Sequence, residues 1–176
     1  RQRQMCIRDS VENAYLSGEG SNQTISFTRK MVSISQSDDE IALIMAHEMS
    51  HAILNHLQED RMNALGGQLL GTIAGTAIGY GIGMETGDPN WVDIFGNTGA
   101  EVGNYMGRIN FSPSQELEAD RIGLEVFLNS GYVFEKGKNI LLYLSDGYSF
   151  ETPYGSTHPV GPERIAHFNR AYEDYE

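Results

Sequence analysis

His47-Glu48-Met49-Ser50-His51 lies within a largely apolar stretch that predicts a helix. In a helix, residues four positions apart differ by about 40° around the axis, so His47 and His51 project from one face, one turn apart. Two neutral imidazoles held in this way can take two corners of a tetrahedral zinc site. Glu48 points to the neighbouring side of the helix, where it can accept a proton from a metal-activated water. The motif therefore predicts a hydrolytic metal site.

The helix that carries this motif begins at a capping signal. Ser37 is expected as the N-cap, with Glu40 three residues later and acidic side chains in the first turn. Apolar residues on most of its faces predict a buried central helix that runs to about Ala64. Burying two histidines and a glutamate in such a helix is costly unless something pairs with them, and a metal ion would do so.

A hydrolytic zinc site needs a third protein ligand. Leu54 and Leu57 stand where a metzincin would have glycine and histidine, which excludes that class. The other route is a carboxylate from a second helix, and Glu116 is the best candidate. Asp120 lies one turn after Glu116, where it can accept the free N–H of a ligating histidine.

The helix that would supply this carboxylate has its own start and stop signals. Ser112 is expected as its N-cap, with Pro113 at the first helical position and Gln115 at the third. The helix is expected to end near Asn129, before Gly131.

Composition restricts the classes of function. The 176 residues suffice for one domain with a real core, and 40% hydrophobic with 20% charged residues excludes a disordered or plain multi-span membrane protein. A formal net charge of −12 argues against nucleic acid as a partner and against docking on anionic lipid. Cys6 is the single cysteine, so no internal disulfide can form.

Residues 1–10 need separate treatment. They contain neither the apolar region nor the cleavage site of a secretory signal. Met5 to Ser10 resembles the translated remnant of a sequencing adaptor. We therefore treat 1–10 as a non-native leader, expect a single domain over 11–176, and expect that the native start and any targeting signal are missing.

Residues 62–84 carry no charge and are rich in glycine. Their glycines recur every four residues, and such a row of glycines lets another backbone approach closely. In lipid, this spacing is a known pattern of helix association. The segment is long enough to cross a bilayer, but its polar residues favour a close-packed or flexible hairpin, or an oligomer contact. Membrane contact and self-association both stay open. The glycines concerned recur every four residues: Gly67, Gly71, Gly75, Gly79 and Gly83.

The remaining segments predict a mainly helical chain with a small sheet. Alternation over 24–28 predicts a strand, and 85–112 reads as a loop-rich connection. A third helix is expected over 136–144 and a last one from about Pro162.

The two motifs together resemble those of a known family. The first motif, followed by Glu116-Leu117-Glu118-Ala119-Asp120-Arg121, resembles zinc metallopeptidase family forty-eight, of the gluzincin clan. That family includes the CAAX prenyl endopeptidase, HtpX, BepA, LoiP and the Oma-type protease. Asn13-Ala14-Tyr15, Ser37-Asp38-Asp39-Glu40 and Thr157-His158-Pro159 with Arg164 also resemble its segments, so the likeness covers about 11–172.

The resemblance implies a gluzincin-type α+β fold, with a small sheet beside the active-site helix. It implies one Zn²⁺ per chain, held by His47, His51 and Glu116. It also implies that His158 and Arg164 lie near the scissile carbonyl, where both side-chain types can stabilise an oxyanion.

The resemblance further implies the activity. The chain would be an endopeptidase that cleaves misfolded or membrane-associated proteins in quality control, with Glu48 as general base. An extended substrate would pair with the strand around Ile25 to Thr28. A bacterial periplasmic or membrane-attached location is expected.

Some alternatives stay open at this stage. His56 lies about 140° around the expected helix from His51, so we expect it to be structural or to support the ligands rather than bind the metal. A non-catalytic binder or chaperone, or a hydrolase of another bond, would also fit the metal motif. The presence of Glu48 favours the enzyme, because metal binding does not require it.

Overall fold

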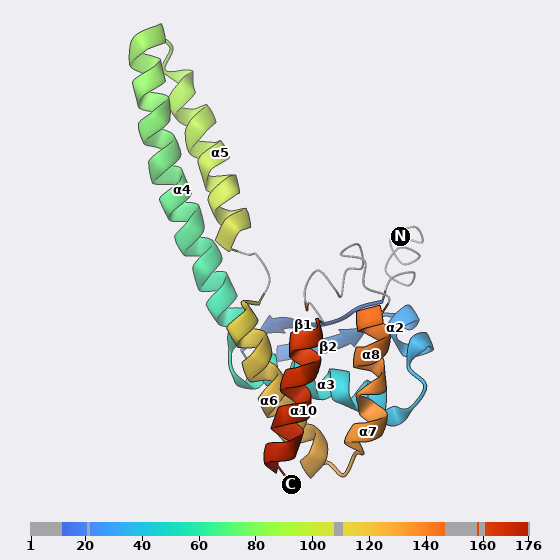
Figure 1. Cartoon of the computed structure of the whole chain (residues 1–176). Coiled ribbons are helices and arrows are strands. Elements are labelled where there is room, and N and C mark those ends of the chain that lie inside the picture. Colours follow the sequence, from blue (N-terminus) through green and yellow to red (C-terminus); the bar gives the residue numbers. More distant parts are fainter. Residues whose placement is uncertain (1–11, 21, 108–110, 147–157, 159–160, 176) are drawn as a thin grey trace. The chain divides into compact units, whose positions relative to one another are not determined.

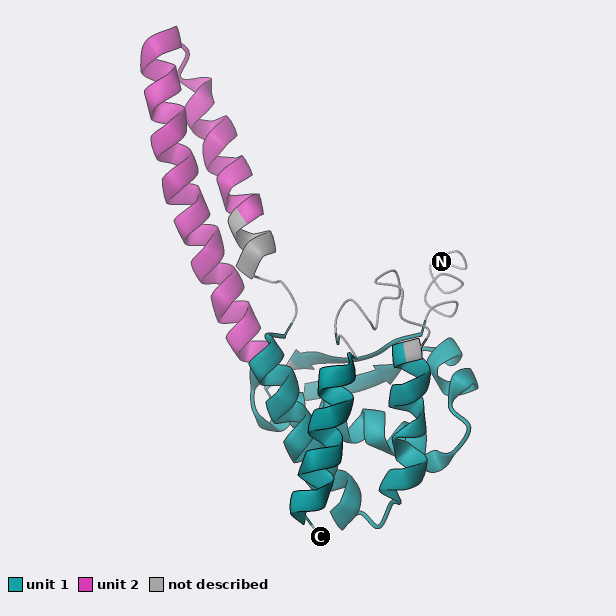
Figure 2. Ribbon diagram, in the orientation of Figure 1, with its two compact units in different colours: residues 1–56, 111–176 teal, residues 57–110 magenta. Residues whose placement is uncertain are grey.

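The computed structural model describes residues 12–20, 22–107, 111–146, 158 and 161–175. These residues form helices and one two-stranded sheet (Figure 1), which confirms the predicted mainly helical α+β class. They fall into two compact units, 1–56 with 111–176, and 57–110 (Figure 2). The elements are β1 (Ala14–Glu19), β2 (Asn22–Phe27), α2 (Arg29–Ile34), α3 (Asp38–Ile53), α4 (His56–Thr86), α5 (Asn90–Gly107), α6 (Pro113–Asn129), α7 (Phe134–Gly137), α8 (Asn139–Asp146) and α10 (Pro162–Tyr175).

Helix α3 is the centre of the first unit. It begins as predicted, because the Ser37 side chain accepts a hydrogen bond from the backbone N–H of Glu40. It packs against α6, α7 and both strands, while α10 packs against α6 and α8. The core between these elements is formed by buried apolar side chains, including Met31, Leu43, Ile44, Leu124, Phe127, Phe134, Ile140 and Phe168.

Helix α3 ends at Ile53, so the predicted continuation to Ala64 is wrong. Asn55 has a φ of 60°, in the left-handed region that an α-helix cannot continue through. Asparagine is one of the few side chains that adopt this conformation readily, often at the end of a helix. The chain turns there, and α4 begins at His56.

Helix α6 has the predicted limits and lies unusually close to α3. Ser112 accepts a hydrogen bond from the N–H of Gln115, whose side chain accepts one from the N–H of Ser112. In the middle of the helix, a Cβ on Gly123 would lie 3.1 Å from the Cα and N of His47. The absence of a side chain at Gly123 thus lets the two helices that carry the metal motifs approach each other.

The smaller elements follow the predictions in part. The strand predicted over 24–28 corresponds to β2, which ends one residue earlier because Thr28 caps α2. It pairs antiparallel with β1 from Ala14↔Phe27 to Glu19↔Asn22. The expected third helix is divided into α7 and α8, and α10 begins at Pro162 as expected. Gly137 ends α7 in close contact with Phe127 of α6.

The second unit is a hairpin of α4 and α5 (Figure 2). The prediction of a loop-rich 85–112 is wrong, because α5 occupies most of it. A Cβ on Gly75 would overlap the carbonyl oxygen of Phe95, and one on Gly79 would overlap that of Trp91. Close packing of two backbones therefore offsets the low helix propensity of glycine. Among the described residues, no helix is both long and apolar enough to cross a membrane.

Candidate metal centre

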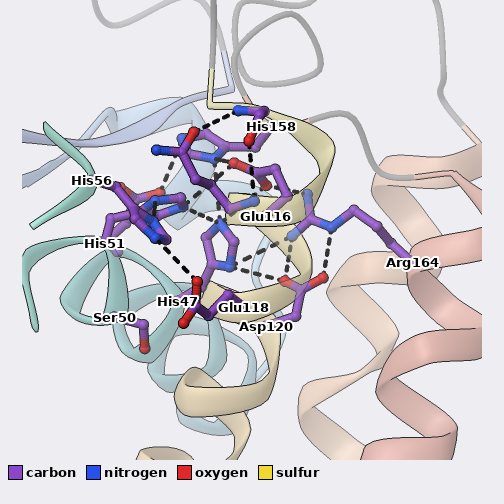
Figure 3. Close-up of polar contacts among 12 residues, drawn as sticks. His47, Ser50, His51, His56, Glu116, Glu118, Asp120, His158 and Arg164 are labelled. Carbon is purple, nitrogen blue, oxygen red and sulfur yellow. Dashed lines mark hydrogen bonds and ion pairs between the residues drawn. The ribbon is translucent and has the colours of Figure 1, made fainter. Parts of the chain in front are cut away.

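Four side chains converge in the first unit (Figure 3). His47 and His51 come from α3, Glu116 comes from the first turn of α6, and His158 precedes α10. All four are buried, and one ligand atom from each lies within 4.8 Å of the other three. The two motif histidines and the carboxylate of a second helix thus lie together, and His158 lies with them.

The distances between these atoms fit a zinc ion. Zinc–nitrogen bonds of about 2.0–2.1 Å in a tetrahedron place neighbouring ligand atoms about 3.3 Å apart. The Nε2 atoms of His47 and His51 are 3.1 Å apart, and His47 Nε2 lies 3.3 Å from His158 Nδ1. Glu116 oxygens lie 3.4 Å from His47 Nε2, 3.4 Å from His51 Nε2 and 2.9 Å from His158 Nδ1. These separations are close to that value, and the four donors lie within 4.8 Å of one another, so the set can hold one cation.

The outer nitrogen of His47 is held by Asp120. His47 Nδ1 lies 2.9 Å from Asp120 Oδ1, which is the partner that the i, i+4 spacing of α6 predicts. Arg164 donates from Nε to Asp120 Oδ2 at 2.8 Å, and its Nη1 lies 2.8 Å from Glu116 Oε2. These contacts fix the imidazole with Nε2 free for a metal.

The outer nitrogen of His51 is held by a histidine. His51 Nδ1 and His56 Nδ1 are 2.9 Å apart, and His56 Nε2 lies 3.7 Å from the carboxylate of Glu118. If His51 uses Nε2 for a metal, its Nδ1–H donates to His56 Nδ1, and the proton of His56 then points at Glu118. Phe111 also stacks on the His51 ring, with centroids 3.8 Å apart.

The sequence interpretation of His56 had the wrong geometry. The 140° separation assumed a continuous helix, but the turn at Asn55 brings His56 back against His51. His56 supports a ligand rather than joining the set of four. An asparagine shortly after the last apolar turn is a helix-stop signal that could have revealed this. No local pattern indicated the role of Phe111.

Glu48 is fully buried beside the cluster. Neither of its carboxylate oxygens forms a hydrogen bond of good geometry with a described residue, and Oε1 lies 3.4 Å from His158 Nε2. Burial raises the pKa of Glu48, and the nearby His158 and His47 oppose only part of that rise. A carboxylate with a raised pKa is a better general base near neutral pH.

The two motif histidines have opposite electrostatic environments. Burial alone would lower the pKa of His47, but hydrogen bonds to Asp120 and Glu116 raise it to about 9. Burial lowers the pKa of His51 to about 3, with partial opposition from Glu116. Burial would raise the pKa of both carboxyls, but His158 and His47 hold that of Glu116 low, and Arg164 holds that of Asp120 low. The centre therefore carries ionised carboxylates that attract a cation.

His158 and Arg164 both lie at the centre, where their side chains contact Glu116 and Asp120. His158 Nδ1 is directed at Glu116, within the set of possible ligands. The Arg164 guanidinium is engaged by Asp120 and Glu116. In the described conformation both side chains therefore serve the metal ligands, so their predicted catalytic roles stay a proposal.

Two imidazoles one helical turn apart, a carboxylate from a second helix and a buried glutamate beside them define a metallopeptidase. The chain belongs to Peptidase family M48, whose family model matches residues 2–171. This confirms the resemblance that the two motifs indicated.

Similar proteins carry related names. The chain is 29% identical over 143 residues to the putative beta-barrel assembly-enhancing protease of Vibrio cholerae serotype O1. It is 30% identical over 138 residues to the beta-barrel assembly-enhancing protease of Escherichia coli strain K12, and 32% over 146 residues to that of E. coli O157:H7. These alignments cover 74–75% of this chain but 27% of each relative, so the chain spans about a quarter of their length.

Proposed function

We propose that this domain is a zinc-dependent endopeptidase that cleaves extended segments of misfolded or membrane-associated proteins. The observation that carries the proposal is the convergence of His47, His51 and Glu116 on one point beside the buried carboxylate of Glu48. The relatives' name, beta-barrel assembly-enhancing protease, supports a protein substrate and a bacterial periplasmic or membrane-associated setting.

Each residue has a distinct part in the proposed reaction. His47, His51 and Glu116 hold the zinc ion, which when bound acidifies a water and polarises the peptide carbonyl. Glu48 accepts the proton of the attacking water and passes it to the leaving amine. Asp120 orients His47. An extended substrate would pair with β2, whose other edge pairs with β1.

His158 closes the site in the described conformation. A nitrogen from each of three histidines and an oxygen of Glu116 lie within 4.8 Å of one another, so His158 would take the position that a hydrolytic site keeps open for water. Hydrolysis would therefore require the His158 side chain to move away from Glu116. The alternative role, which the family resemblance implies, is that the His158 imidazole donates to the oxyanion that develops on the carbonyl.

The deciding experiment compares wild type with Glu48→Gln on unfolded casein, with zinc content measured in both. Loss of the base is expected to lower the cleavage rate about 10²–10⁴-fold while one zinc per chain is retained. Glu173→Gln, at an exposed position on α10, is the matched control and should cleave like wild type. Equal cleavage by Glu48→Gln and wild type would remove Glu48 from the mechanism. Zinc bound without any cleavage by wild type would favour the non-catalytic binder.

Contact with a membrane or a second copy through the glycines of 62–84 also stays a proposal. Gly75 and Gly79 already face α5, so such a contact would need the hairpin to open. Deleting residues 66–84 and following the protein between membrane and soluble fractions tests the membrane contact.

A further inference from the structure

The second unit joins the first at two residues that both contact the proposed metal ligand His51. The segment 57–110 follows His56 and precedes Phe111. The Nδ1 atoms of His56 and His51 are 2.9 Å apart (Figure 3), and the Phe111 ring stacks on the His51 ring with centroids 3.8 Å apart. The two residues that flank the inserted segment are therefore both held against one imidazole.

The joint at His56 is short and tightly bonded. Two residues separate the end of α3 at Ile53 from the start of α4 at His56. The first of them, Leu54, donates its backbone N–H to the carbonyl of Ser50 at 2.9 Å, and the second, Asn55, has a φ of 60°. His56 is itself buried and belongs to the first turn of α4, so its ring moves with that helix.

The joint at Phe111 lies among the imidazoles of the centre. The centroid of its ring is 5.4 Å from that of His158 and 6.1 Å from that of His56. Phe111 immediately precedes Ser112, the N-cap of α6, and Glu116 lies in the first turn of that helix. A displacement of Phe111 would therefore disturb both the packing of the ligand rings and the start of the helix that supplies the carboxylate.

His47 offers a contrast within the same centre. Its outer nitrogen lies 2.9 Å from Asp120 Oδ1, and Arg164 donates to the other oxygen of Asp120. Neither Asp120 nor Arg164 flanks the inserted segment. Loosening of the joints would thus leave the support of His47 in place and remove that of His51.

We propose that the α4–α5 hairpin regulates the metal centre through these two joints. His56 and Phe111 are positioning residues, which orient His51 when the first turn of α4 is ordered and release it when that turn loosens. The inference rests on the proposed zinc-dependent function and names the regulation of that site. A molecule that binds the hairpin then alters zinc binding to the extent that it favours ordered or loosened joints.

The first test loosens one joint and keeps both positioning residues. Two glycines inserted between His56 and Leu57 separate His56 from the rest of α4. The same two glycines inserted between Gly87 and Asp88, in the turn between α4 and α5, are the matched control. The joint insertion should lower zinc affinity, measured by chelator competition, about 10–100-fold, the range typical when a ligand loses its supporting contact, and the control should match wild type. Equal zinc affinities in the two insertion variants would overturn the proposal.

Amide hydrogen exchange in the unaltered chain gives a test that does not depend on the folding of a variant. Coupling between two sites is reciprocal, so if ordered joints favour zinc, zinc must also favour ordered joints. Zinc should therefore slow exchange in residues 60–64, near the start of α4, more than in residues 82–86 at its end. Unchanged exchange in 60–64, or equal slowing in both segments, would contradict the regulation.

Substitutions of His56 separate orientation of His51 from simple packing. His56→Leu removes the acceptor for the Nδ1–H of His51, whereas His56→Asn places an amide oxygen near the former Nδ1. His56→Leu should lower zinc affinity about 10–100-fold and alter the visible spectrum of the cobalt-substituted protein, while His56→Asn should stay close to wild type in both. An equal loss in the two variants would mean that His56 only fills space, and its positioning role would be refuted.

These measurements also separate this inference from the proposed function. Zinc affinity, hydrogen exchange and cobalt spectra need no substrate, so they support the regulation even if wild type cleaves no casein. If casein is cleaved and the joint insertion leaves zinc affinity unchanged, the regulation fails and the proposed function stands.

Discussion

His47 and His51 belong to one motif, yet their outer nitrogens meet different partners. Asp120 is an ionised carboxylate and His56 is an imidazole, at the same distance of 2.9 Å from their respective rings. The carboxylate favours a proton on His47, whereas burial without such a partner disfavours one on His51. A hydrogen-bond acceptor and Phe111 therefore hold His51 in place without adding charge.

His158 is the residue at which ligand and catalytic roles can be separated by mutation. We expect His158→Ala to retain zinc and to cleave small peptides faster than wild type, because removing the imidazole admits water to the fourth position. Peptidase rates with stoichiometric zinc give the first readout. The visible spectrum of the cobalt-substituted protein gives the second, since exchange of a nitrogen for water changes the ligand field.

The control for this substitution is His167→Ala, on α10 and outside the ligand cluster. It should leave the cobalt spectrum unchanged. A strong loss of peptidase activity in His158→Ala, with its zinc retained, would instead support the predicted role of His158 as an oxyanion donor.

At the scale of elements, the approach of α6 to α3 sets the distance between the two metal motifs. Gly123 lies one turn after Asp120 and two after Glu116 on the same face of α6. Its contact with the backbone of His47 fixes how near these carboxylates come to the imidazoles. Packing at a glycine thus controls ligand geometry two turns away.

Gly123→Ala tests this dependence. A Cβ at 3.1 Å from the His47 backbone must push the helices apart by a few tenths of an ångström. We expect a loss of roughly 1–3 kcal/mol from overpacking, which exceeds the gain of about 1 kcal/mol in helix propensity. Zinc affinity, measured by chelator competition, should fall with it.

Gly66→Ala is the matched control, because it makes the same substitution inside α4 where no atom lies within 4 Å of the added Cβ. It should leave zinc affinity unchanged and should not destabilise the chain. If Gly123→Ala behaves in the same way, the close approach of α6 does not determine the ligand geometry.

Signals local in the sequence predicted where α3 and α6 begin. They did not predict where α3 ends or that α5 is a helix. Ser37 and Ser112 cap their helices as expected, because capping depends on residues close in sequence. The end of α3 depends on one left-handed residue, Asn55, inside a stretch that is otherwise helical. Helix α5 was missed because its support comes from the glycine face of α4, which its own sequence does not reveal.

At the metal centre, too, local relations were predictable from the sequence and tertiary ones were not. Helical spacing predicted that His47 pairs with His51 and that Asp120 lies one turn from Glu116, since both are local relations. The convergence of the two helices could be inferred only by recognising the motifs as a set. The place of His158 within the ligand cluster depends on the fold of the whole first unit.

For the whole molecule, the metal would join segments that are far apart in sequence. Its proposed ligands come from α3 and α6, which pack around the core of the first unit, and His158 joins them from the segment that precedes α10. A metal that binds the folded but not the unfolded chain adds its binding free energy to stability. The second unit, α4 with α5, contains none of the ligands.

Removing zinc should therefore lower the stability of the chain by an amount that depends on pH. With a pKa of about 9, His47 is protonated at pH 7 in the metal-free protein, so zinc must displace that proton. Zinc affinity should rise about tenfold per pH unit from 7 to 9, or about 1.4 kcal/mol per unit. His51, with a pKa of about 3, adds no such dependence in this range.

The stability of the metal-free protein should fall as pH rises over the same range. The raised pKa of His47 contributes stability that is fully present below its unfolded value of about 6.5 and is lost as pH rises through about 9. Thermal unfolding with stoichiometric zinc and with excess chelator, at pH 7, 8 and 9, should thus show a gap in Tm that widens with pH. In Asp120→Asn, which removes the carboxylate that raises the pKa of His47, the gap should change less across the same range. A gap of constant width in wild type would mean that no proton leaves the centre when zinc binds, contrary to the pairing of His47 with Asp120.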